Sequence, residues 1–281
     1  MSSDEVVLAE PDDGLACSEV GAWTEEKHRL VSLYSTLFSS GMKDKWGKRV
    51  YIELYAGPGH SKIRDTSRII AGSPIRALRV KDPFDKYIFC EENPAYLEAL
   101  RVRVKVVAPA ANVIYIAGDC NKHATDILAE ISSSVLSLCF ADPFDIGLKF
   151  ETLWTLSNCR VDFVVLLAVY SDANRAYKRY VMEDAVKVDE FLGSKTWRER
   201  WKIAQDMATP FPKFLAEEFS KSMESLGYLP TPLHAMKRVK KSGEKNLPLY
   251  YIALFSRNKL AYKFWDEVLK YSTDQRKFSW G

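Results

Sequence analysis

The sequence predicts an α/β fold, with a doubly wound and mostly parallel sheet, an antiparallel last strand and a helical insertion. Short apolar runs recur between residues 50 and 168, and helical patterns separate them. Runs that are apolar almost throughout are typical of parallel strands covered by helices on both faces. Beyond residue 173 the alternation gives way to helical segments dense in aromatic and charged residues, which indicates an insertion before the last strands.

The first half of the chain is expected to alternate between helices and strands. Residues 1–19 are acidic and polar, and we expect them to form a flexible leader. Apolar spacings of three and four over 30–38 predict the first helix. Ser73-Pro74 is typical of a helix start after a polar loop at 62–72. The expected elements are helices at 23–46, 73–80 and 94–107 and strands at 50–54, 87–90 and 113–117.

The second half continues this alternation and then departs from it. The expected elements are helices at 123–131, 149–156 and 260–271, strands at 135–140, 161–168, 233–239 and 249–255, and a basic turn at 240–245. These elements divide the chain into a leader at 1–19, an α/β core at 20–173, a helical insertion at 174–228, and a C-terminal hairpin and helix at 229–281 that complete the core.

Composition excludes several classes of protein. The 281 residues carry a net charge of +3, which neither demands nor excludes an anionic partner. No apolar run approaches the roughly 20 residues that span a bilayer, and the N-terminus lacks the pattern of a secretion signal. We therefore expect a cytoplasmic protein without a membrane partner. The five cysteines form no C-x-x-C pair and the four histidines are scattered, which argues against a disulfide framework and a protein-ligated metal.

The stretch Tyr51–Ser61 has the pattern of a ligand-binding strand end. An apolar run ends at the acidic Glu53, and the small-residue turn Ala56-Gly57-Pro58-Gly59 follows. Glycines let a backbone turn sharply and approach a ligand, and a following helix N-terminus offers free N–H groups. Pro58 removes one backbone N–H, so the turn suits an uncharged or zwitterionic ligand better than a pyrophosphate.

Acidic residues also end the next three strands, at Glu91, Asp119 and Asp142. In a doubly wound sheet ligands bind outside the carboxyl ends of the strands, so these side chains are expected at one site. A turn without side chains can hold the amino-acid portion of a cofactor, Glu91 can accept hydrogen bonds from ribose hydroxyls, and Asp119 can accept one from an adenine amino group. Alternatively, each acid could cap a helix or pair with a lysine.

This series of strand ends resembles the class I S-adenosylmethionine-dependent methyltransferases over residues 50–168, and the hairpin at 233–255 suits the last two strands of that Rossmann-like fold. A closer resemblance is to the three-Cys-motif partner proteins, a bacterial family. The shared motifs are L-Y-A-G-P-G at 54–59, G-S-P at 72–74, F-C-E-E-N-P at 89–94, G-D-C-N at 118–121, D-P-F at 142–144 and Y-I-A-L-F-S-R-N at 251–258. The family implies a methyltransferase-like fold and a partner protein with a cysteine motif, but no substrate.

The resemblance implies S-adenosylmethionine as the cofactor of the core at 20–173 and assigns residues to it. The residues around the methionine portion are Glu53, Tyr55, Ala56, Gly57 and Gly59, the ribose residue is Glu91, and the residues near the adenine are Asp119 and Cys120.

Asp142-Pro143-Phe144 resembles the D-P-P-(Y/F) motif of enzymes that methylate amino groups of nucleobases. In that motif the acid and a proline carbonyl accept hydrogen bonds from the target amino group, and the aromatic ring stacks on the base. The resemblance implies that Asp142, Pro143 and Phe144 perform this catalytic positioning. One proline is missing here, and Asp145 stands where an aromatic residue is found. The alternative is a strand-end aspartate that caps the helix near residue 149.

Substrate-side residues are expected in three loops. Asp145 follows the fourth strand, and Ser171, Asp172, Asn174 and Arg175 follow the fifth. Arg64 lies with Lys62 and Arg68 in the loop after the glycine turn and could face an anionic substrate. The basic residues of 237–245 could contact phosphates, although such a turn is usually only solvated.

Three functional hypotheses result. The leading one is a methyltransferase that uses S-adenosylmethionine and acts on a nucleobase or another planar, amino-bearing acceptor. The second is a non-catalytic or accessory subunit that serves the cysteine-motif partner. The third is a nucleic-acid-processing enzyme that binds a divalent metal through Asp119, Asp142 and Asp145.

Overall fold

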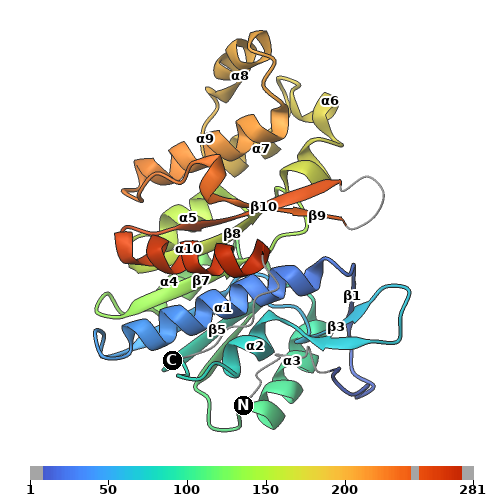
Figure 1. Cartoon of the computed structure of the whole chain (residues 1–281), viewed down its shortest axis with the longest axis vertical. Coiled ribbons are helices and arrows are strands. Elements are labelled where there is room, and N and C mark those ends of the chain that lie inside the picture. The colour runs from blue at the N-terminus through green and yellow to red at the C-terminus, as the bar shows by residue number, and fades with distance from the viewer. Residues whose placement is uncertain (1–8, 242–246, 274–281) are drawn as a thin grey trace. The chain divides into compact units, whose positions relative to one another are not determined.

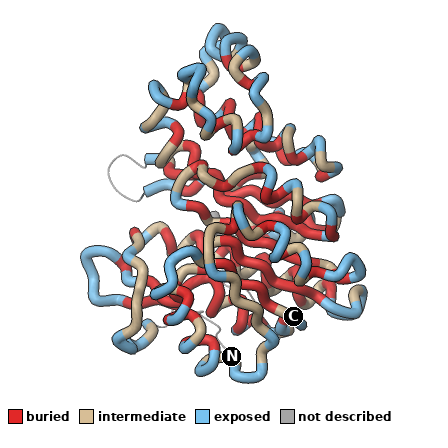
Figure 2. The backbone as a smooth tube through the Cα atoms, turned by 180° about the vertical axis from the view of Figure 1, so that it is seen from behind, coloured by how far each residue is buried: buried red, intermediate tan, exposed pale blue. Residues whose placement is uncertain are grey.

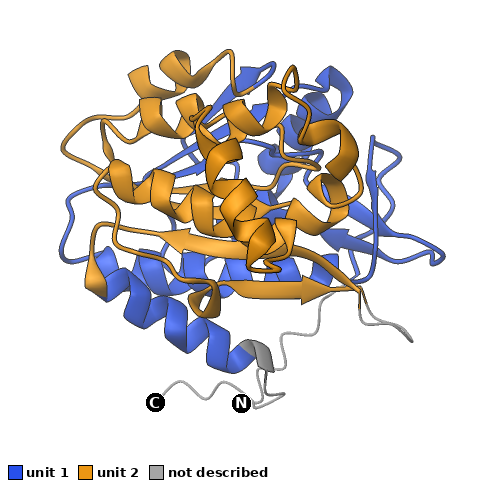
Figure 3. Cartoon of the chain, turned by 90° about the horizontal axis from the view of Figure 1, so that it is seen from above, with its two compact units in different colours: residues 1–119, 260–281 blue, residues 120–259 orange. Residues whose placement is uncertain are grey.

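The structure is a computed structural model that describes residues 9–241 and 247–273 (Figure 1). The chain folds into two compact units (Figure 3). The first unit comprises residues 1–119 and 260–281, and the second comprises residues 120–259. This boundary falls within the segment 20–173 that the sequence predicts as one core.

The main sheet of the first unit contains three parallel strands in the order β6-β5-β2. They are β2 (Arg49–Glu53), β5 (Lys86–Glu91) and β6 (Val113–Ala117). In the central register Ile52 lies opposite Ile88, and Ile88 lies opposite Ile114. The interior of β5 and all of β2 are buried, as the apolar runs predict (Figure 2).

Four helices belong to the first unit: α1 (Thr24–Met42), α2 (Ser73–Leu78), α3 (Pro94–Val107) and α10 (Lys259–Thr273). Helices α1 and α10 lie side by side (Figure 1), with the Tyr34 and Trp265 rings in edge contact at 5.6 Å between centroids. At the start of α3, the Asn93 side chain accepts hydrogen bonds from the backbone N–H groups of Ala95 and Tyr96. The four helices confirm the sequence prediction to within a few residues.

A second, smaller sheet corrects two predictions. It contains β1 (Ser18–Val20), β3 (His60–Ile63) and β4 (Ile69–Ala71) in the order β1-β3-β4. The predicted loop at 62–72 is therefore a hairpin for most of its length. The predicted leader at 1–19 is wrong for residues 9–19, because Ser18 pairs with Ser61 and Glu10 bridges to Ile69. Residues 1–8 lie outside the described residues.

The sheet of the second unit contains four strands in the order β7-β8-β10-β9. Strands β7 (Leu136–Ala141) and β8 (Arg160–Leu167) are parallel, and β10 (Pro248–Phe255) runs antiparallel to both β8 and β9 (Lys237–Lys240). The antiparallel last strand is therefore confirmed. The strand predicted at 233–239 begins only at Lys237, because residues 233–235 form a 3₁₀ turn. The hairpin tip 242–246, with the predicted phosphate contact Lys245, lies outside the described residues.

The remaining helices surround this sheet within the second unit. Helices α4 (Ala124–Ala129) and α5 (Phe150–Leu156) alternate with the strands. A π-helical turn (Val169–Ala173) ends the predicted core, and the predicted insertion at 174–228 contains α6 (Tyr177–Tyr180), α7 (Lys187–Leu192), α8 (Trp197–Asp206) and α9 (Phe211–Ser225). Its aromatic side chains form a core: Phe191, Trp197, Trp201, Phe211 and Phe214 are all buried.

Two further sequence expectations can be compared with the structure. All five cysteines are free thiols, and four of them are buried. Within residues 9–241 and 247–273, no helix is both long enough and apolar enough to cross a membrane.

Candidate functional site

The glycine turn after β2 is held by the acid that ends β5. The backbone N–H of Gly57 donates a hydrogen bond of 2.7 Å to one carboxylate oxygen of Glu91, and the N–H of Asn93 donates one of 2.8 Å to the other. Ionised carboxylate oxygens have further lone pairs, so Glu91 retains capacity to accept hydrogen bonds from a ligand. The structure thus brings together two of the predicted cofactor residues from separate strand ends.

The two glycines of this turn have different surroundings. Both have positive φ, +65° at Gly57 and +85° at Gly59, which other residues rarely adopt. A Cβ atom on Gly57 would meet nothing within 4 Å, whereas one on Gly59 would lie 3.0 Å from Leu100 and 3.2 Å from Ile75. Gly57 therefore borders open space that a ligand can enter. Gly59 instead packs closely against neighbouring side chains, and its predicted role as a cofactor contact stays a prediction.

Glu53 also has a role different from the predicted one. Its side chain is completely buried, accepts a 3.1 Å hydrogen bond from the Tyr51 hydroxyl, and accepts another from the Ser73 hydroxyl. Because no part of it is exposed, Glu53 joins the end of β2 to the start of α2 rather than presenting a carboxylate to a ligand. Ala56 is likewise buried, and its N–H bonds to the Cys90 carbonyl at 2.9 Å.

Arg103 of α3 anchors the turn from the other side and was not predicted. Its buried guanidinium donates to the Pro58 carbonyl at 2.6 Å and forms two hydrogen bonds, of 2.8 and 2.6 Å, with Asp13. These bonds hold the pKa of the Asp13 carboxyl at about 2. The signal in the sequence is an arginine three residues after Leu100 on an otherwise apolar helix face. Arg103 explains why the segment before β1 is held in place.

The end of β6 is joined to the end of β5. The Gly118 N–H donates to the Glu91 carbonyl at 3.0 Å, and the Cys90 thiol donates to the Gly118 carbonyl at 3.3 Å. Asp119, the next residue, and Tyr55 are both half-buried. Cys120 is buried. The roles of Tyr55, Asp119 and Cys120 toward a cofactor stay predictions.

In the second unit, the D-P-F segment follows β7 directly. Pro143 is buried, Asp142 is half-buried, and the Phe144 side chain is 88% exposed. A phenylalanine this exposed buries almost none of its apolar surface in the folded chain. The segment therefore presents an aromatic face to solvent beside a partly accessible carboxylate.

Asp145 takes part in a network of charged side chains, although its side chain is still 48% exposed. It accepts hydrogen bonds of 2.7 Å from the Gly147 N–H and 2.6 Å from the Lys187 ammonium. Lys187 also lies 3.6 Å from Asp172, which accepts the Ile146 N–H at 3.0 Å. The Tyr180 hydroxyl of α6 donates to the same Asp172 carboxylate. Asp145 therefore helps to hold the D-P-F loop, and its predicted role toward a substrate stays a prediction.

The charge state of Lys187 follows from the same contacts. Burial lowers the pKa of Lys187, but its hydrogen bonds with Asp145 and Tyr180 and the charge of Asp172 raise it more, so the net pKa lies above the ordinary value. The ammonium therefore stays charged between its two carboxylates. This network of Asp145, Asp172, Tyr180 and Lys187 was not predicted, because its members come from four separate segments: the loop after β7, the π-helical turn, α6 and α7.

Asn121 of the G-D-C-N motif fixes the far end of this loop. Its amide donates to the Gly147 carbonyl at 3.0 Å, and its carbonyl accepts from the Lys149 N–H and the Thr152 hydroxyl at 2.9 and 2.8 Å. The G-D-C-N motif did not predict this role of Asn121. The Lys149 N–H is satisfied by Asn121 at the start of α5, so the structure gives no support to Asp142 as the cap of that helix.

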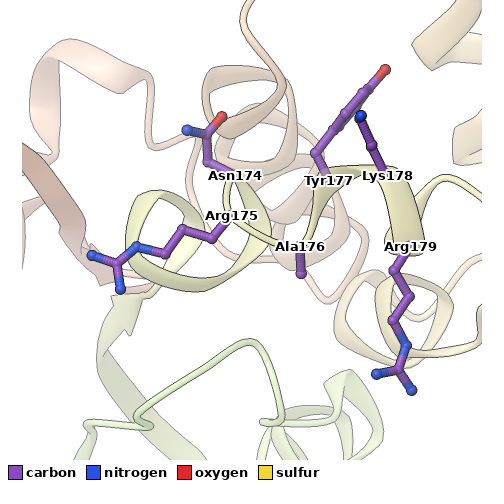
Figure 4. Close-up of a pocket in the computed structure, with 6 residues that line it drawn as sticks. All are labelled: Asn174, Arg175, Ala176, Tyr177, Lys178 and Arg179. Atoms are coloured by element: carbon purple, nitrogen blue, oxygen red, sulfur yellow. The ribbon is translucent and has the colours of Figure 1, made fainter.

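An open hollow of about 380 Å³ follows the π-helical turn (Figure 4). Its lining includes the predicted substrate residue Asn174, while Ser171 bonds weakly to the Ala168 carbonyl at 3.4 Å. Arg64 is exposed in the turn between β3 and β4 of the first unit. The residues that line the hollow are Asn174, Arg175, Ala176, Tyr177, Lys178 and Arg179.

The carboxylate–metal hypothesis receives no support from these contacts. In the part of the chain that the structure describes, no group of three or more His, Cys, Asp or Glu side chains could hold a metal ion. Asp145, one of the three carboxylates in that hypothesis, is paired with an ammonium instead.

Parallel strands that alternate with helices, with a glycine turn and acids at their carboxyl ends, define a Rossmann-like α/β fold. No protein-family model matches the chain, and neither does any curated protein. Among solved structures, the chain is similar to TYW2 of M. jannaschii in complex with AdoMet, with 13% identity, a TM-score of 0.40, and coverage of 85% of this chain and 78% of that one.

Two further solved structures are similar to the chain. One is Trm1 of Pyrococcus horikoshii with S-adenosyl-L-methionine, with 10% identity, a TM-score of 0.45, and coverage of 94% of this chain and 62% of that one. The other is precorrin-6y C5,15-methyltransferase of Geobacter metallireducens, with 14% identity, a TM-score of 0.42, and coverage of 89% and 98%.

Proposed function

We propose that this chain is a cytoplasmic methyltransferase that uses S-adenosylmethionine and acts on a nucleobase or a similar planar, amino-bearing acceptor. The observation that carries the proposal is the hydrogen bond from the Gly57 N–H to Glu91 beside open space. It supports a cofactor whose amino-acid portion lies on a turn without side chains and whose ribose is bound by an acid.

Gly57, Glu91, Asp119 and Cys120 are the residues we propose to hold the cofactor. A Cβ atom at position 57 would take up part of the open space beside Gly57. A glycine there therefore allows a ligand to approach the backbone closely. When bound, the cofactor supplies an electrophilic methyl group. The residues of this chain contribute orientation: Glu91 accepts ribose hydroxyl hydrogen bonds, and Glu53, Ser73 and Arg103 keep the turn in place.

Phe144 and Asp142 are the residues we propose for the acceptor. An exposed ring after a strand end can stack on a planar base, which is worth roughly 1–3 kcal/mol. The Asp142 carboxylate then accepts a hydrogen bond from the acceptor amino group and orients its nitrogen lone pair. The network around Lys187 supports this by holding the loop that carries both residues.

Isothermal titration calorimetry tests cofactor binding. We expect heat of binding with S-adenosylmethionine or its demethylated product, and no heat with Gly57→Val, because the new side chain occupies the ligand space. Gly14→Val is a matched control, since Gly14 also has a positive φ of +71° and no atom within 4 Å of an added Cβ. Absence of heat with the folded parent protein contradicts the proposal.

A second proposal is an accessory subunit that serves a partner protein with a cysteine motif, as the resemblance to the three-Cys-motif partner family implies. The observation that favours it is a set of exposed apolar side chains in the segment after α6, in α8 and directly after α8. They are Met182, Val186, Ile203 and Met207, which are 54–75% exposed. Methyl transfer by the isolated chain, lost in Asp142→Ala with the fold intact, excludes a purely accessory role.

A further inference from the structure

The hollow after the π-helical turn is lined by cations that have no acidic partner. Arg175, Lys178 and Arg179 are all exposed, and none forms an ion pair with another residue of the described ranges 9–241 and 247–273. Elsewhere in the second unit several cations are paired, as Lys187, Arg198 and Arg200 are with Asp145, Asp189 and Glu218. The nearest acids in the sequence are Asp172, Glu183 and Asp184, and none of them lines the hollow.

The three cations do not converge on a single point. Figure 4 shows Arg175 and Arg179 extending to opposite sides of the segment, while Lys178 lies beside Tyr177 on a third side. One small anion would draw the cations together, whereas an extended chain of phosphates can meet cations spread along a surface. The Tyr177 ring is not available for stacking, because it packs in edge contact against Phe211 at 5.0 Å between centroids.

The hollow and the exposed Phe144 ring are anchored to the same carboxylate. Asp172 accepts a hydrogen bond from the Ile146 N–H of the D-P-F loop and from the Tyr180 hydroxyl at the end of α6. Both the ring and the cations therefore belong to segments whose positions depend on Asp172. Aromatic faces next to basic surface are the combination that single-stranded nucleic acids bind, because their bases stack while their phosphates meet the cations.

We propose that Arg175, Lys178 and Arg179 bind the phosphate backbone of a single-stranded nucleic acid, with an unstacked base against Phe144. The acceptor is then a base within a strand, not a free nucleoside. This inference rests on the proposed function for the identity of the base, but the phosphate contacts can be measured without methyl transfer. A single strand is favoured over a duplex because a base stacked inside a helix does not offer its face to Phe144.

Fluorescence anisotropy with the full chain and labelled RNA and DNA single strands of about 12 nucleotides tests the proposal. The test variant combines Arg175→Gln, Lys178→Gln and Arg179→Gln. The control variant combines Lys195→Gln, Lys202→Gln and Lys213→Gln, which removes the same charge from exposed and unpaired lysines that do not line the hollow. We expect the test variant to bind roughly tenfold more weakly, and its slope of log affinity against log salt to fall by about 2.

The control variant should stay close to the parent protein in both measurements. Phe144→Ala should weaken binding by about tenfold and leave the salt slope unchanged, since stacking releases no counterions. Equal losses in the two triple variants would mean non-specific attraction and would overturn the proposal. Equally tight binding of a duplex, of polyglutamate or of vesicles containing phosphatidylserine would also overturn it.

Photocrosslinking of the unaltered chain to 4-thiouridine-containing RNA gives a result that does not depend on how the variants fold. We expect crosslinks in peptides that contain Phe144 or residues 174–179. If the RNA binds but no crosslinks form in these peptides, the proposal is contradicted. Calorimetry with the cofactor separates the two proposals. Strand binding without cofactor binding rejects the proposed function alone, and cofactor binding without strand binding at the hollow rejects this inference alone.

Discussion

A single buried carboxylate connects the glycine turn to the helix that follows it. Glu53 accepts a hydrogen bond from the hydroxyl of Ser73 at the start of α2. The backbone N–H of the neighbouring Gly72 donates a hydrogen bond of 2.7 Å to the Gly59 carbonyl. The turn and the helix start are therefore joined twice. A buried carboxylate requires such donors, since an unsatisfied buried acceptor loses its hydration without compensation.

Ser73→Ala should therefore destabilise the protein. The substitution removes one donor from a completely buried carboxylate, and we expect the free energy of unfolding to fall by about 1–3 kcal/mol. Urea denaturation followed by circular dichroism measures this change. Ser67→Ala is the control, because Ser67 is exposed in the turn between β3 and β4 and should change stability by less than about 0.5 kcal/mol. Similar effects of the two substitutions would contradict the role of Ser73.

The loop after β7 owes its shape to groups outside its own sequence. The backbone N–H of Ile146 donates a hydrogen bond to Asp172, and the N–H of Gly147 donates one to Asp145. The ammonium group of Lys187 in α7 lies between these two carboxylates. Without the ammonium, two like charges would face each other across the loop. An element that carries the proposed acceptor residues is thus held by a cation from another element.

Lys187→Met should loosen this loop. We expect hydrogen exchange at the Ile146 and Gly147 amides to become roughly tenfold faster, because charge-assisted hydrogen bonds to their acceptors are lost. Mass spectrometry of the peptide that covers 142–149 measures the exchange. Lys195→Met is the control, since Lys195 is exposed and forms no ion pair within the described chain. Unchanged exchange in Lys187→Met would show that the carboxylates hold the loop by themselves.

The stability of the whole molecule should depend on pH through Asp162. This residue of β8 is buried, and burial raises the pKa of its carboxyl to about 7, although Ser256 and Arg257 partly oppose the shift. Between about pH 4 and 7, the Asp162 carboxyl therefore keeps its proton in the folded state but has lost it in the unfolded state. Since the unfolded chain carries fewer protons in this range, stability falls as the pH rises from 4 to 7 and is constant, for this group, above 7.

Asp162→Asn should remove this part of the pH dependence. Relative to the parent, the variant should gain stability as the pH rises from 5 to 8, by roughly 2–3 kcal/mol, because about two units of the shift lie in this pH range. Chemical denaturation at both pH values gives the difference. Asp206→Asn, on an exposed position of α8, is the control and should show parallel pH profiles. A parallel profile for Asp162→Asn would mean that Asp162 is charged in the folded protein at neutral pH.

Much of the fold could be predicted because most elements have a local signal. The apolar run at 161–168 and the Ser73-Pro74 helix start depend only on neighbouring residues, and β8 and α2 lie where these signals predict them. The small sheet had no such signal. Its strands are three or four residues long and partly polar, and β1 pairs with β3, whose residues lie 43 positions later in the chain.

The candidate site divides in the same way. Glu91 and Gly57 were predicted from strand-end motifs, and the hydrogen bond between them is a consequence of β2 and β5 being parallel neighbours. Glu53 and Asp145 have the same acidic character and the same strand-end position in the sequence. Only the structure shows that Glu53 is buried among its donors, whereas Asp145 is paired with Lys187 and still half exposed.

By itself the sequence determined the α/β class, the glycine turn with its acids, and the D-P-F motif, because apolar periodicity and turn chemistry are local properties of the chain. Tertiary structure decided which of these polar groups are satisfied internally and which stay accessible. That outcome depends on residues distant in sequence, such as Ser73 beneath Glu53 and Lys187 beside Asp145. A carboxylate that finds a buried donor holds the fold, and one that keeps accessible lone pairs, such as Glu91, can bind a ligand.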